Sequence, residues 1–333
     1  MSGGEAGGVG RPQPLAVVVL ASLNMDLVLT ATKIPRPGET VLAGSLTRMA
    51  GGKGANQAVA AARLGAEVTL IGRLGDDSVG SEIRGELART GVRLDHLRDI
   101  EGASSGLAVV TVDPQGENAI VVSPGANHEL TPEELARDEA ALGKPVIAVA
   151  QLETPLDTVR RFAEVAVDNG AELVLNAAPF HELSDELLHR CAYLIVNRDE
   201  AGSLSGSTVR TRADAVAALE QLVARGAGGV VVTLGSQGCI ALTAQGLFEL
   251  PAYQVAVVDT TGAGDAFVGA FAAALASRAG LEQALQFAAA AGAVTCRVAG
   301  AQQDALSYGR VSELIREQPQ VRVSRAAAHV QST

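Results

Sequence analysis

DTTGAGDAF, residues 259–267, decides the expected fold, because a glycine-rich turn here leads directly into an alanine-rich helix. We expect the residues before the turn to form a strand. A strand, a glycine turn and a helix in this order present successive backbone N–H groups to an anion. Gly262 and Gly264 would let the backbone approach a phosphate closely, since no Cβ stands in the way. The stretch therefore predicts an anion-binding loop between a strand and a helix.

The carboxylate of Asp265 allows two interpretations. It falls in the first turn of the expected helix, where the helix dipole and free N–H groups stabilise a negative charge, so an ordinary cap is one of them. The other is a general base, because phosphoryl transfer to an alcohol requires a carboxylate that accepts the hydroxyl proton. The loop would then supply both the base and the donors that hold the transferring group.

On either side of this stretch, short β-branched runs alternate with helical patterns. Continuous apolar strands that alternate with amphipathic helices indicate an α/β fold, in which helices cover both faces of a mostly parallel central sheet. We expect strands at 16–20, 68–71, 145–150, 173–175, 193–196 and 230–233, and helices at 55–64, 155–168, 185–190, 213–225, 266–277 and 281–296.

Two segments depart from this alternation, residues 27–47 and 106–122. The second consists of two strand-like runs joined by DPQG at 113–116, a turn sequence, so we expect a β-hairpin. We interpret the two segments as a small sheet that projects from the main domain and acts as a lid. A second lid would cover its exposed edges, which predicts a homodimer. We expect residues 1–14 to be a disordered tail and residues 15–330 to form a single domain.

The composition is that of a globular chain, and it argues against some classes of binding partner. Of 333 residues, 47% are hydrophobic and 19% are charged, and the net charge is −11, so we expect no attraction to nucleic acid or to anionic membranes. The apolar run 15–21 is too short to span a bilayer. Cys191, Cys239 and Cys296 show no metal-ligand spacing and indicate free thiols in a reducing cytoplasm.

GGKGANQ at 51–57 precedes an alanine-rich helix and looks like a phosphate loop. It lacks the four residues between glycines and the Ser or Thr after Lys that a Walker loop requires. Three glycines around Lys53 and Asn56 suit close approach to a polyhydroxyl ligand, because an Asn side chain both donates and accepts hydrogen bonds. A plain glycine turn before a helix is the alternative.

Further polar residues follow expected strands, where ligands gather in open α/β sheets. NMD at 24–26 follows the first strand and suits vicinal hydroxyls, with an Asx turn as the local alternative. NRDE at 197–200 either forms a capping box or arranges water around Mg²⁺ near a triphosphate. Glu153 ends another strand and is placed similarly. TLGSQG at 233–238 is a glycine-rich turn after a strand that can hold nucleotide phosphates.

Taken together, these motifs resemble the ribokinase-like, or pfkB, carbohydrate kinases. GGKGANQA at 51–58 and DTTGAGDAF at 259–267 resemble the two signatures of that family, and NRDE matches its Asn-x-x-Glu element. The likeness runs from about residue 17 to residue 302. PGET at 37–40 and QLE at 151–153 are closer to the ribose kinases of the family than to its adenosine kinases or fructokinases. The resemblance implies a Rossmann-like α/β fold with a small β-sheet lid.

The resemblance also implies a role for each matching residue. Asp265 would be the base that activates the 5-hydroxyl of the sugar, with Gly262, Ala263 and Gly264 forming the anion hole. The sugar would contact Asn24, Met25, Asp26, Gly52, Lys53, Gly54, Ala55, Asn56, Glu153 and Asp265. ATP would lie along Asn197, Thr233, Leu234, Gly235, Ser236, Gln237, Gly238, Gly264, Asp265 and Ala289. Asn197 and Glu200 would act on Mg²⁺ indirectly, and K⁺ would be held, mainly through carbonyl groups, by Asp259, Thr261, Thr295, Val298, Gly300 and Asp304.

Two single residues and one short segment depart from the pattern of the family. Ala289 falls where relatives often place His or Asn beside the adenine, so this contact is expected to be lost. Asp304 falls where relatives usually have Ser near the cation, and an extra carboxylate would either tighten or distort that site. AAP at 177–179 replaces an NPAP-like sequence and is expected to change little.

The resemblance implies ATP-dependent phosphorylation of D-ribose at O5, with Mg²⁺ and K⁺ as cofactors. The nearest alternative is another acceptor, namely deoxyribose, fructose or a nucleoside, because the sequence does not rank the groups that face C1 and C2. A sugar sensor without catalysis fits poorly with an intact Asp265 and its glycines. A nicotinamide dehydrogenase would need a G-x-G-x-x-G turn after the first strand, where ASLNMD stands at 21–26.

Overall fold

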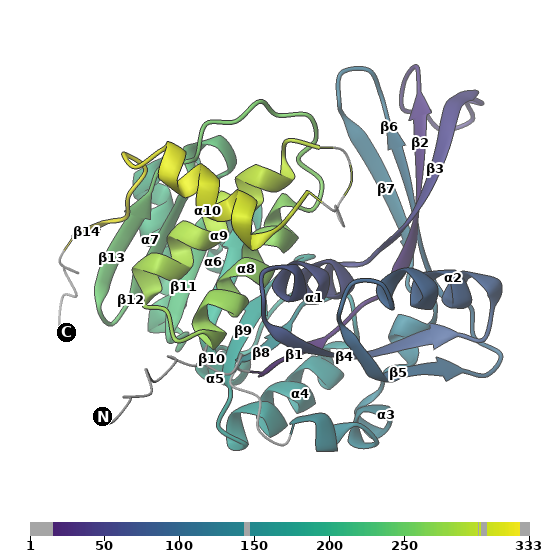
Figure 1. The fold of residues 1–333 in the computed structure, drawn as a ribbon, viewed down its shortest axis with the longest axis horizontal. Helices are drawn as coiled ribbons and strands as arrows, with labels where there is room; N and C mark the ends of the chain where they lie inside the picture. Colours follow the sequence, from purple (N-terminus) through teal and green to yellow (C-terminus); the bar gives the residue numbers. More distant parts are fainter. Residues whose placement is uncertain (1–15, 143–146, 299, 301–304, 327–333) are drawn as a thin grey trace, which may run out of the picture.

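The structure is a computed structural model that describes residues 16–142, 147–298, 300 and 305–326. Its strands form a large sheet of ten strands and a small sheet of four. Figure 1 shows the large sheet inside the main body and the small sheet standing out from that body. The expected tail at 1–14 and the first two residues of the strand expected at 145–150 lie outside the described residues.

The large sheet is parallel except at one edge. Its order is β14-β13-β12-β11-β10-β9-β8-β1-β4-β5; the pairs from β11 to β5 are parallel, and those from β11 to β14 are antiparallel. This confirms the mostly parallel sheet. The strands are β1 (Ala16–Leu20), β4 (Glu67–Gly75), β5 (Arg93–Ile100), β8 (Ile147–Ala150), β9 (Glu172–Asn176), β10 (Cys191–Asn197), β11 (Gly229–Thr233), β12 (Cys239–Thr243), β13 (Gly246–Leu250) and β14 (Ser324–Ala326).

Helices cover both faces of this sheet. Val17 and Val19 of β1 enter one hydrophobic cluster with α1, α8 and α9, whereas Val18 and Leu20 enter another with α4, α5 and α7. Because successive side chains of a strand point to opposite faces, a strand covered on both sides must be apolar throughout. The helices are α1 (Lys53–Arg63), α2 (Ser78–Leu87), α3 (Pro132–Ala136), α4 (Leu156–Asp168), α5 (Asp185–Arg190), α6 (Arg198–Ser205), α7 (Arg212–Ala224), α8 (Ala263–Ala276), α9 (Leu281–Thr295) and α10 (Tyr308–Glu317). In the described ranges, none is long and apolar enough to cross a membrane.

The small sheet has the order β3-β2-β6-β7 and combines the two segments that depart from the α/β pattern. The expected hairpin is confirmed: β6 and β7 pair antiparallel, and in the turn the N–H of Gly116 donates to the carbonyl of Asp113 at 3.0 Å. β2 pairs parallel with β6, which joins the two segments into one sheet. The strands are β2 (Asn24–Ala31), β3 (Ala43–Gly51), β6 (Gly106–Val112) and β7 (Asn118–Ser123).

The segment before the glycine turn is not a strand, contrary to the expectation. The residues between β13 and α8 form no ladder, because the outer edge of β13 is already paired with β14. Their backbone bonds elsewhere: the side chain of Gln318 accepts from the N–H of Gln254 at 2.9 Å and donates to its carbonyl at 2.8 Å. The N–H of Val258 donates to the carbonyl of Cys296 at 2.8 Å. α9 and α10 therefore hold this segment in place of a neighbouring strand.

Candidate active site

The residues predicted to bind sugar meet beyond the C-terminal ends of β1 and β8. Ser22 follows β1, and its Oγ donates to Oε2 of Glu153, which follows β8, at 2.6 Å. The N–H of Lys53, the first residue of α1, donates to the same oxygen at 2.9 Å. Ser22 was not among the predicted site residues. The two donors fix the Glu153 carboxylate against the start of α1, where Gly52, Gly54, Ala55 and Asn56 also lie.

The carboxylate of Asp265 does not cap its own helix. α8 follows Gly262, which has a left-handed φ of 73°, and no side chain accepts a hydrogen bond from the first turn. Instead, Oδ2 of Asp265 accepts from Nδ2 of Asn56 at 3.1 Å, and Oδ1 accepts from Nε2 of Gln57 at 3.0 Å. Both donors belong to α1. The capping interpretation is therefore wrong, and the carboxylate points toward the residues predicted to bind sugar.

A single ammonium group interacts with four carboxylates at this place. Burial lowers the pKa of Lys53, but the carboxylates of Asp265, Glu153, Glu200 and Asp26 outweigh burial, so the pKa is raised. Burial raises the pKa of Asp265, an effect that Lys53 and the two amide donors on α1 offset only in part. Burial is also the main reason for the raised pKa of Glu200. Lys53 therefore stays charged and attracts the surrounding carboxylates electrostatically.

The residues at 24–26 form the start of β2 rather than an Asx turn. Burial, together with the charges of Glu153 and Asp265, raises the pKa of Asp26 to about 7. Near neutral pH its carboxyl group exists in both forms, so it can donate or accept a hydrogen bond. Met25 points the other way, because side chains alternate along a strand, and it is fully buried in the core. The structure does not bring the side chain of Met25 to the site.

Asn127 is a further polar residue of the site that the sequence reasoning missed. Its Nδ2 donates to Oδ1 of Asn24 at 2.9 Å and to the carbonyl of Leu23 at 2.9 Å, while its Oδ1 accepts from the N–H of Leu23 at 2.8 Å. The bond fixes Oδ1 of Asn24, so the amide of Asn24 presents Nδ2 as its donor. Asn127 and Asn24 are 103 residues apart, and no spacing in the sequence indicates the pair.

The first turn of α8 supplies the backbone donors of the predicted anion hole. The N–H of Ala263 donates to the carbonyl of Thr260 at 3.2 Å. Within the described part of the chain, the N–H groups of Gly264 and Asp265 have no acceptor. Such groups attract anions, because they and the helix dipole point outward at a helix start. Gly264, rather than Ala263, is therefore the predicted donor that remains available.

The residues predicted to contact the nucleotide lie at the ends of β10 and β11, where Asn197 and Thr233 pair in the ladder. Oδ1 of Asn197 accepts from the N–H of Glu200 at 2.8 Å, and Oε2 of Glu200 accepts from the N–H of Asn197 at 2.8 Å. This is the capping box, and it uses one oxygen of each side chain. The side chain of Gln237 accepts from Arg198. Leu234, Gly235, Ser236 and Gly238 complete the turn after β11, and Ala289 lies partly buried on α9.

The two segments predicted to hold K⁺ meet at Asp259. Oδ1 of Asp259 accepts from the N–H of Thr261 at 2.9 Å, and its Oδ2 accepts from the N–H of Gly300 at 2.9 Å. In the described ranges, no group of three or more His, Cys, Asp or Glu side chains could hold a metal ion. The other predicted residues are Thr295 at the end of α9, Val298 just after it, and Asp304, which lies outside the described residues.

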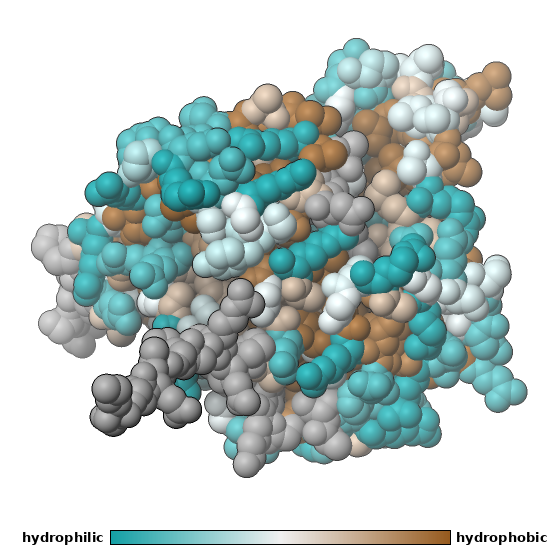
Figure 2. Space-filling view, viewed as in Figure 1, coloured by the Kyte–Doolittle hydropathy of each residue, from teal (hydrophilic) through white to brown (hydrophobic). Residues whose placement is uncertain are grey.

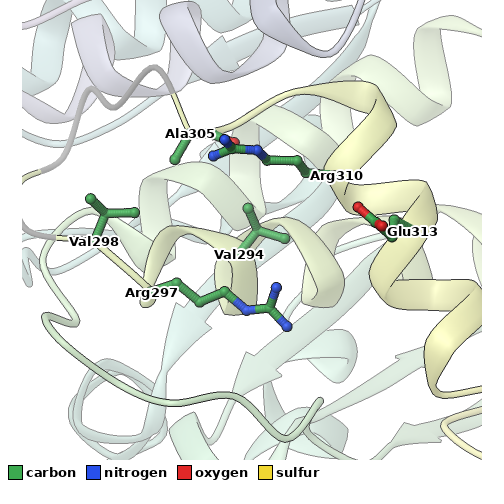
Figure 3. A pocket seen from close by; sticks show the side chains of 6 residues that line it. All are labelled: Val294, Arg297, Val298, Ala305, Arg310 and Glu313. Carbon is green, nitrogen blue, oxygen red and sulfur yellow. The ribbon is translucent and has the colours of Figure 1, made fainter.

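A pocket of about 140 Å³ opens beside this segment, between α9 and α10 (Figure 3). No residue that we predict to contact sugar or nucleotide lines it. Val298 connects it to the predicted cation segment. The pocket is therefore separate from the site around Asp265. Its lining consists of Val294, Arg297, Val298, Ala305, Arg310 and Glu313.

Comparison with known proteins identifies the family of the chain. The family described as pfkB family carbohydrate kinase matches residues 15–307. A ribokinase of Bacillus subtilis is 37% identical over 299 residues, which cover 90% of this chain and 99% of that protein. A deoxyribokinase of Salmonella typhimurium is 36% identical over 257 residues, covering 77% of this chain and 84% of that protein.

The fold is shared with solved structures. A ribokinase of Arabidopsis thaliana, complexed with ribose and ATP, is 32% identical, and the similarity covers 91% of this chain and 99% of that one with a TM-score of 0.85. The family match and the sequence identities extend over most of the chain. The chain therefore belongs to the pfkB family of carbohydrate kinases.

Proposed function

We propose that the chain catalyses the ATP-dependent phosphorylation of D-ribose at O5. The observation that carries the proposal is the position of the Asp265 carboxylate, which lies 3.0 Å from Nε2 of Gln57 and 3.1 Å from Nδ2 of Asn56 on the sugar-side helix. The same residue lies in the first turn of α8, where the N–H groups of Gly264 and Asp265 have no acceptor among the described residues. The Asp265 carboxylate therefore lies between the start of α1, whose polar side chains suit hydroxyl groups, and the start of α8, whose N–H groups suit a phosphate. The relative bound to ribose and ATP supports this pair of substrates.

In the proposed reaction, Asp265 accepts the proton of the O5 hydroxyl while O5 attacks the γ-phosphorus of ATP. The bond between this phosphorus and the bridging oxygen breaks, and its electron pair leaves with ADP. The N–H of Gly264 and the dipole of α8 stabilise the negative charge on the transferring group. Lys53 lowers the pKa of Asp265 and so favours the basic form of its carboxylate against the effect of burial.

The sugar-side residues offer both donors and acceptors, as neighbouring hydroxyl groups require. Asn24 presents Nδ2, because Asn127 occupies its Oδ1. Asp26 and Glu153 present carboxyl oxygens, and Lys53 presents an ammonium group. In the proposed enzyme the small sheet closes over the sugar and excludes water, which limits hydrolysis of ATP.

Mg²⁺ would neutralise charge on the phosphates when it is bound. Asn197 and Glu200 fit an indirect role, because the capping box leaves Oε1 of Glu200 available for water around the ion. For K⁺, the carboxylate of Asp259 would supply an oxygen ligand that suits a hard cation, and carbonyl groups of the predicted residues would supply the others. Asp259 joins residues 261 and 300, so a cation held there would order the loop that leads into α8.

We expect ADP release from Mg-ATP to be fastest with ribose and to rise when K⁺ is added. The assay compares ribose, 2-deoxyribose, fructose, adenosine and no sugar, each with and without K⁺. 2-Deoxyribose is the second candidate, because a deoxyribokinase is 36% identical to this chain. If turnover is faster with 2-deoxyribose, the proposed acceptor would change from ribose to 2-deoxyribose, and Asp265 would remain the proposed base. Folded protein that turns over none of these acceptors would contradict the proposed function.

We also propose that two chains pair through their small sheets. The exposed edges and faces of this sheet carry apolar side chains, which are visible at the upper right of Figure 2. Exposed strand edges tend to pair with another chain unless they are covered. The exposed apolar residues of the small sheet and its loop are Leu42, Leu46, Ile120, Val121 and Val122.

We place the enzyme in the cytoplasm, because its three cysteines are free thiols, which suits a reducing compartment.

Light scattering at micromolar concentration is expected to give twice the chain mass of 33.9 kDa. Val121→Lys should shift the mass toward that of a monomer, because it places a charge on a side chain that is 72% exposed on the edge strand β7. Val257→Lys is the matched control, since Val257 is 61% exposed but lies outside the small sheet. A wild-type chain that is monomeric, or a Val121→Lys chain that stays dimeric, would contradict pairing through this sheet.

A further inference from the structure

We propose that Gln57 is a positioning residue that fixes the orientation of the Asp265 carboxylate through a chain of buried amides leading to the backbone of β10. The proposal rests on the function proposed above, in which Asp265 is the base. Gln57 lies in the GGKGANQ stretch, yet nothing in the sequence assigned it a role. It does not need to touch the substrate. Its effect passes through the carboxylate that it holds.

Gln57 has three hydrogen bonds from a side chain that is only 1% exposed. Its Nε2 donates to Oδ1 of Asp265 at 3.0 Å and to Oδ1 of Asn176 at 3.0 Å. Its Oε1 accepts from Nε2 of Gln151 at 2.7 Å. Both hydrogens of the amide are therefore used, and only one of them goes to the catalytic carboxylate.

A backbone carbonyl group determines which atom of each amide donates and which accepts. Nδ2 of Asn176 donates to the carbonyl oxygen of Ile195 at 3.1 Å, and a carbonyl oxygen can only accept. Oδ1 of Asn176 must then face Gln57, so Gln57 has to present Nε2 to it. If the Gln57 amide turned over, its oxygen would face two acceptor oxygens and its nitrogen would face the donor of Gln151. The chain therefore permits one orientation, in which an N–H points at Asp265.

The backbones of α1 and α8 are close enough to place this donor. Gly269 lies one turn after Asp265 on α8, and a Cβ on it would stand 2.5 Å from the carbonyl oxygen of Gln57 and 2.7 Å from Cβ of Ala60. Only a residue without a side chain allows this approach. Gly269 therefore brings the helix that carries the base against the helix that carries its donor.

The charges that act on Asp265 come from several elements. Lys53 on α1 lowers the pKa of Asp265, and Glu153 after β8 raises it. Asp26 on β2 and Glu200 on α6 also interact with it. Burial raises the pKa of Asp265 most, and the hydrogen bonds from Gln57 and Asn56 lower it. Because these charges remain in a Gln57 variant, loss of the Gln57 donor should by itself raise the pKa of the base.

Gln57→Met is expected to lower kcat about 10- to 100-fold, because the carboxylate loses its orientation, with KM values changed about twofold or less. Met conserves the volume of the side chain and removes all three hydrogen bonds. The base works only when it is deprotonated, so the acidic limb of the kcat–pH profile should move to higher pH. Gln57→Glu should move the limb further, because it adds a carboxylate beside Asp265.

Gln286→Met serves as the matched control. Gln286 also has a donor bond, from Nε2 to the carbonyl of Val321 at 3.0 Å, but it is only partly buried and lies on α9, not on the helices that carry Gln57 and Asp265. This variant should keep the wild-type kcat–pH profile, whatever its melting temperature. Circular dichroism and the active fraction show whether each Gln57 variant is folded before its kinetics are compared.

A Gln57→Met enzyme with the kcat and the acidic limb of the wild type would overturn the proposal. So would a folded variant that loses kcat with an unmoved limb, because a purely structural role predicts that result. If the Met variant does not fold, Gln57→Glu and Gln151→Met, which removes the donor to Oε1 of Gln57, provide the same test. The acceptor is whichever sugar the wild type phosphorylates. Failure of the wild type with ribose therefore counts against the proposed function, and not against Gln57.

Discussion

Asp265→Asn is expected to lower kcat for sugar phosphorylation about 10²- to 10⁴-fold, because it removes the only proton acceptor that the proposed mechanism uses. Asn has the shape of Asp, and its Oδ1 can still accept from Nε2 of Gln57. The amide of Asn56 can turn over to face the new Nδ2. The surroundings of the side chain should therefore survive, and the loss should fall on the chemical step.

The stability of this variant should not fall. Burial raises the pKa of Asp265 above its usual range, so ionising this carboxyl group costs more free energy in the folded chain than in the unfolded one. Replacing it with a neutral amide removes this cost, and the melting temperature should stay the same or rise. Activity and stability would then move in opposite directions, as is common for residues that serve catalysis.

Two measurements check this prediction: single-turnover kinetics for the chemical step, and calorimetry for the binding of ribose, which should change little. Asp157→Asn is the matched control, because Asp157 also lies in the first turn of a helix, α4, but is exposed and pairs with the exposed Arg160. A kcat within tenfold of the wild type would show that Asp265 is not the base. Loss of ribose binding together with activity would assign it to sugar binding instead.

Asp138→Asn is expected to destabilise the fold by roughly 3 kcal/mol, because it removes one of the two carboxylates that pair with a buried guanidinium. The other carboxylate, Glu134, lies 3.3 Å from Nε of Arg73 and is partly exposed, so it compensates for the buried charge only in part. Asp138 and Arg73 are both fully buried, and Nη2 of Arg73 donates to Oδ2 of Asp138 at 2.8 Å. The other oxygen, Oδ1, accepts from Arg98 at 2.6 Å and lies 2.9 Å from Nδ1 of His96. The cluster joins β4 and β5 to the segment after α3, at one edge of the large sheet.

The effect should depend on pH in a defined direction. Burial raises the pKa of Asp138, but hydrogen bonds from Arg98, His96 and Arg73 outweigh burial and lower it. A carboxyl group with a lowered pKa stabilises the fold above its unfolded pKa and loses this contribution as the pH falls through its folded pKa. The difference between wild type and variant should therefore be largest near neutral pH and smaller in acid.

Urea unfolding at neutral and at acidic pH measures both the loss of unfolding free energy in the variant and its dependence on pH. Arg98→Met is the matched control in the same cluster, because its side chain is 43% exposed and its loss leaves the Arg73–Asp138 pair intact. We expect this control to cost about 1 kcal/mol or less. Equal losses in the two variants would mean that burial of Arg73 does not determine the energy of the cluster.

Local patterns in the sequence predicted much of the large sheet. The strand expected at 16–20 and the helix expected at 185–190 have the same bounds in the structure, as β1 and α5. Both depend on contacts between near neighbours, namely a continuous apolar run and a capped helical repeat. The hairpin of β6 and β7 was also predictable, because the DPQG turn has its own local chemistry.

The same local reasoning failed where distant parts of the chain decide the outcome. The glycine turn before the helix led us to expect a strand ahead of it, but β14 occupies the edge that such a strand would need. Met25 stood between two polar site residues and was grouped with them, yet the alternation of β2 turns its side chain into the core. Each prediction failed because a local sequence pattern does not specify which part of the chain will pack against that segment.

The sequence by itself determined that the chain is an α/β carbohydrate kinase, and it predicted a polar sugar site and a glycine turn beside Asp265, since these features lie in short continuous motifs. Only the tertiary structure decided how they act together. Gln57 and Asp265 are 208 residues apart, and Asn127 and Asn24 are 103 apart. A hydrogen bond needs donor and acceptor within about 3 Å and in the right direction. Between residues so distant along the chain, only the packing of α1, α8 and the sheet sets that distance and that direction.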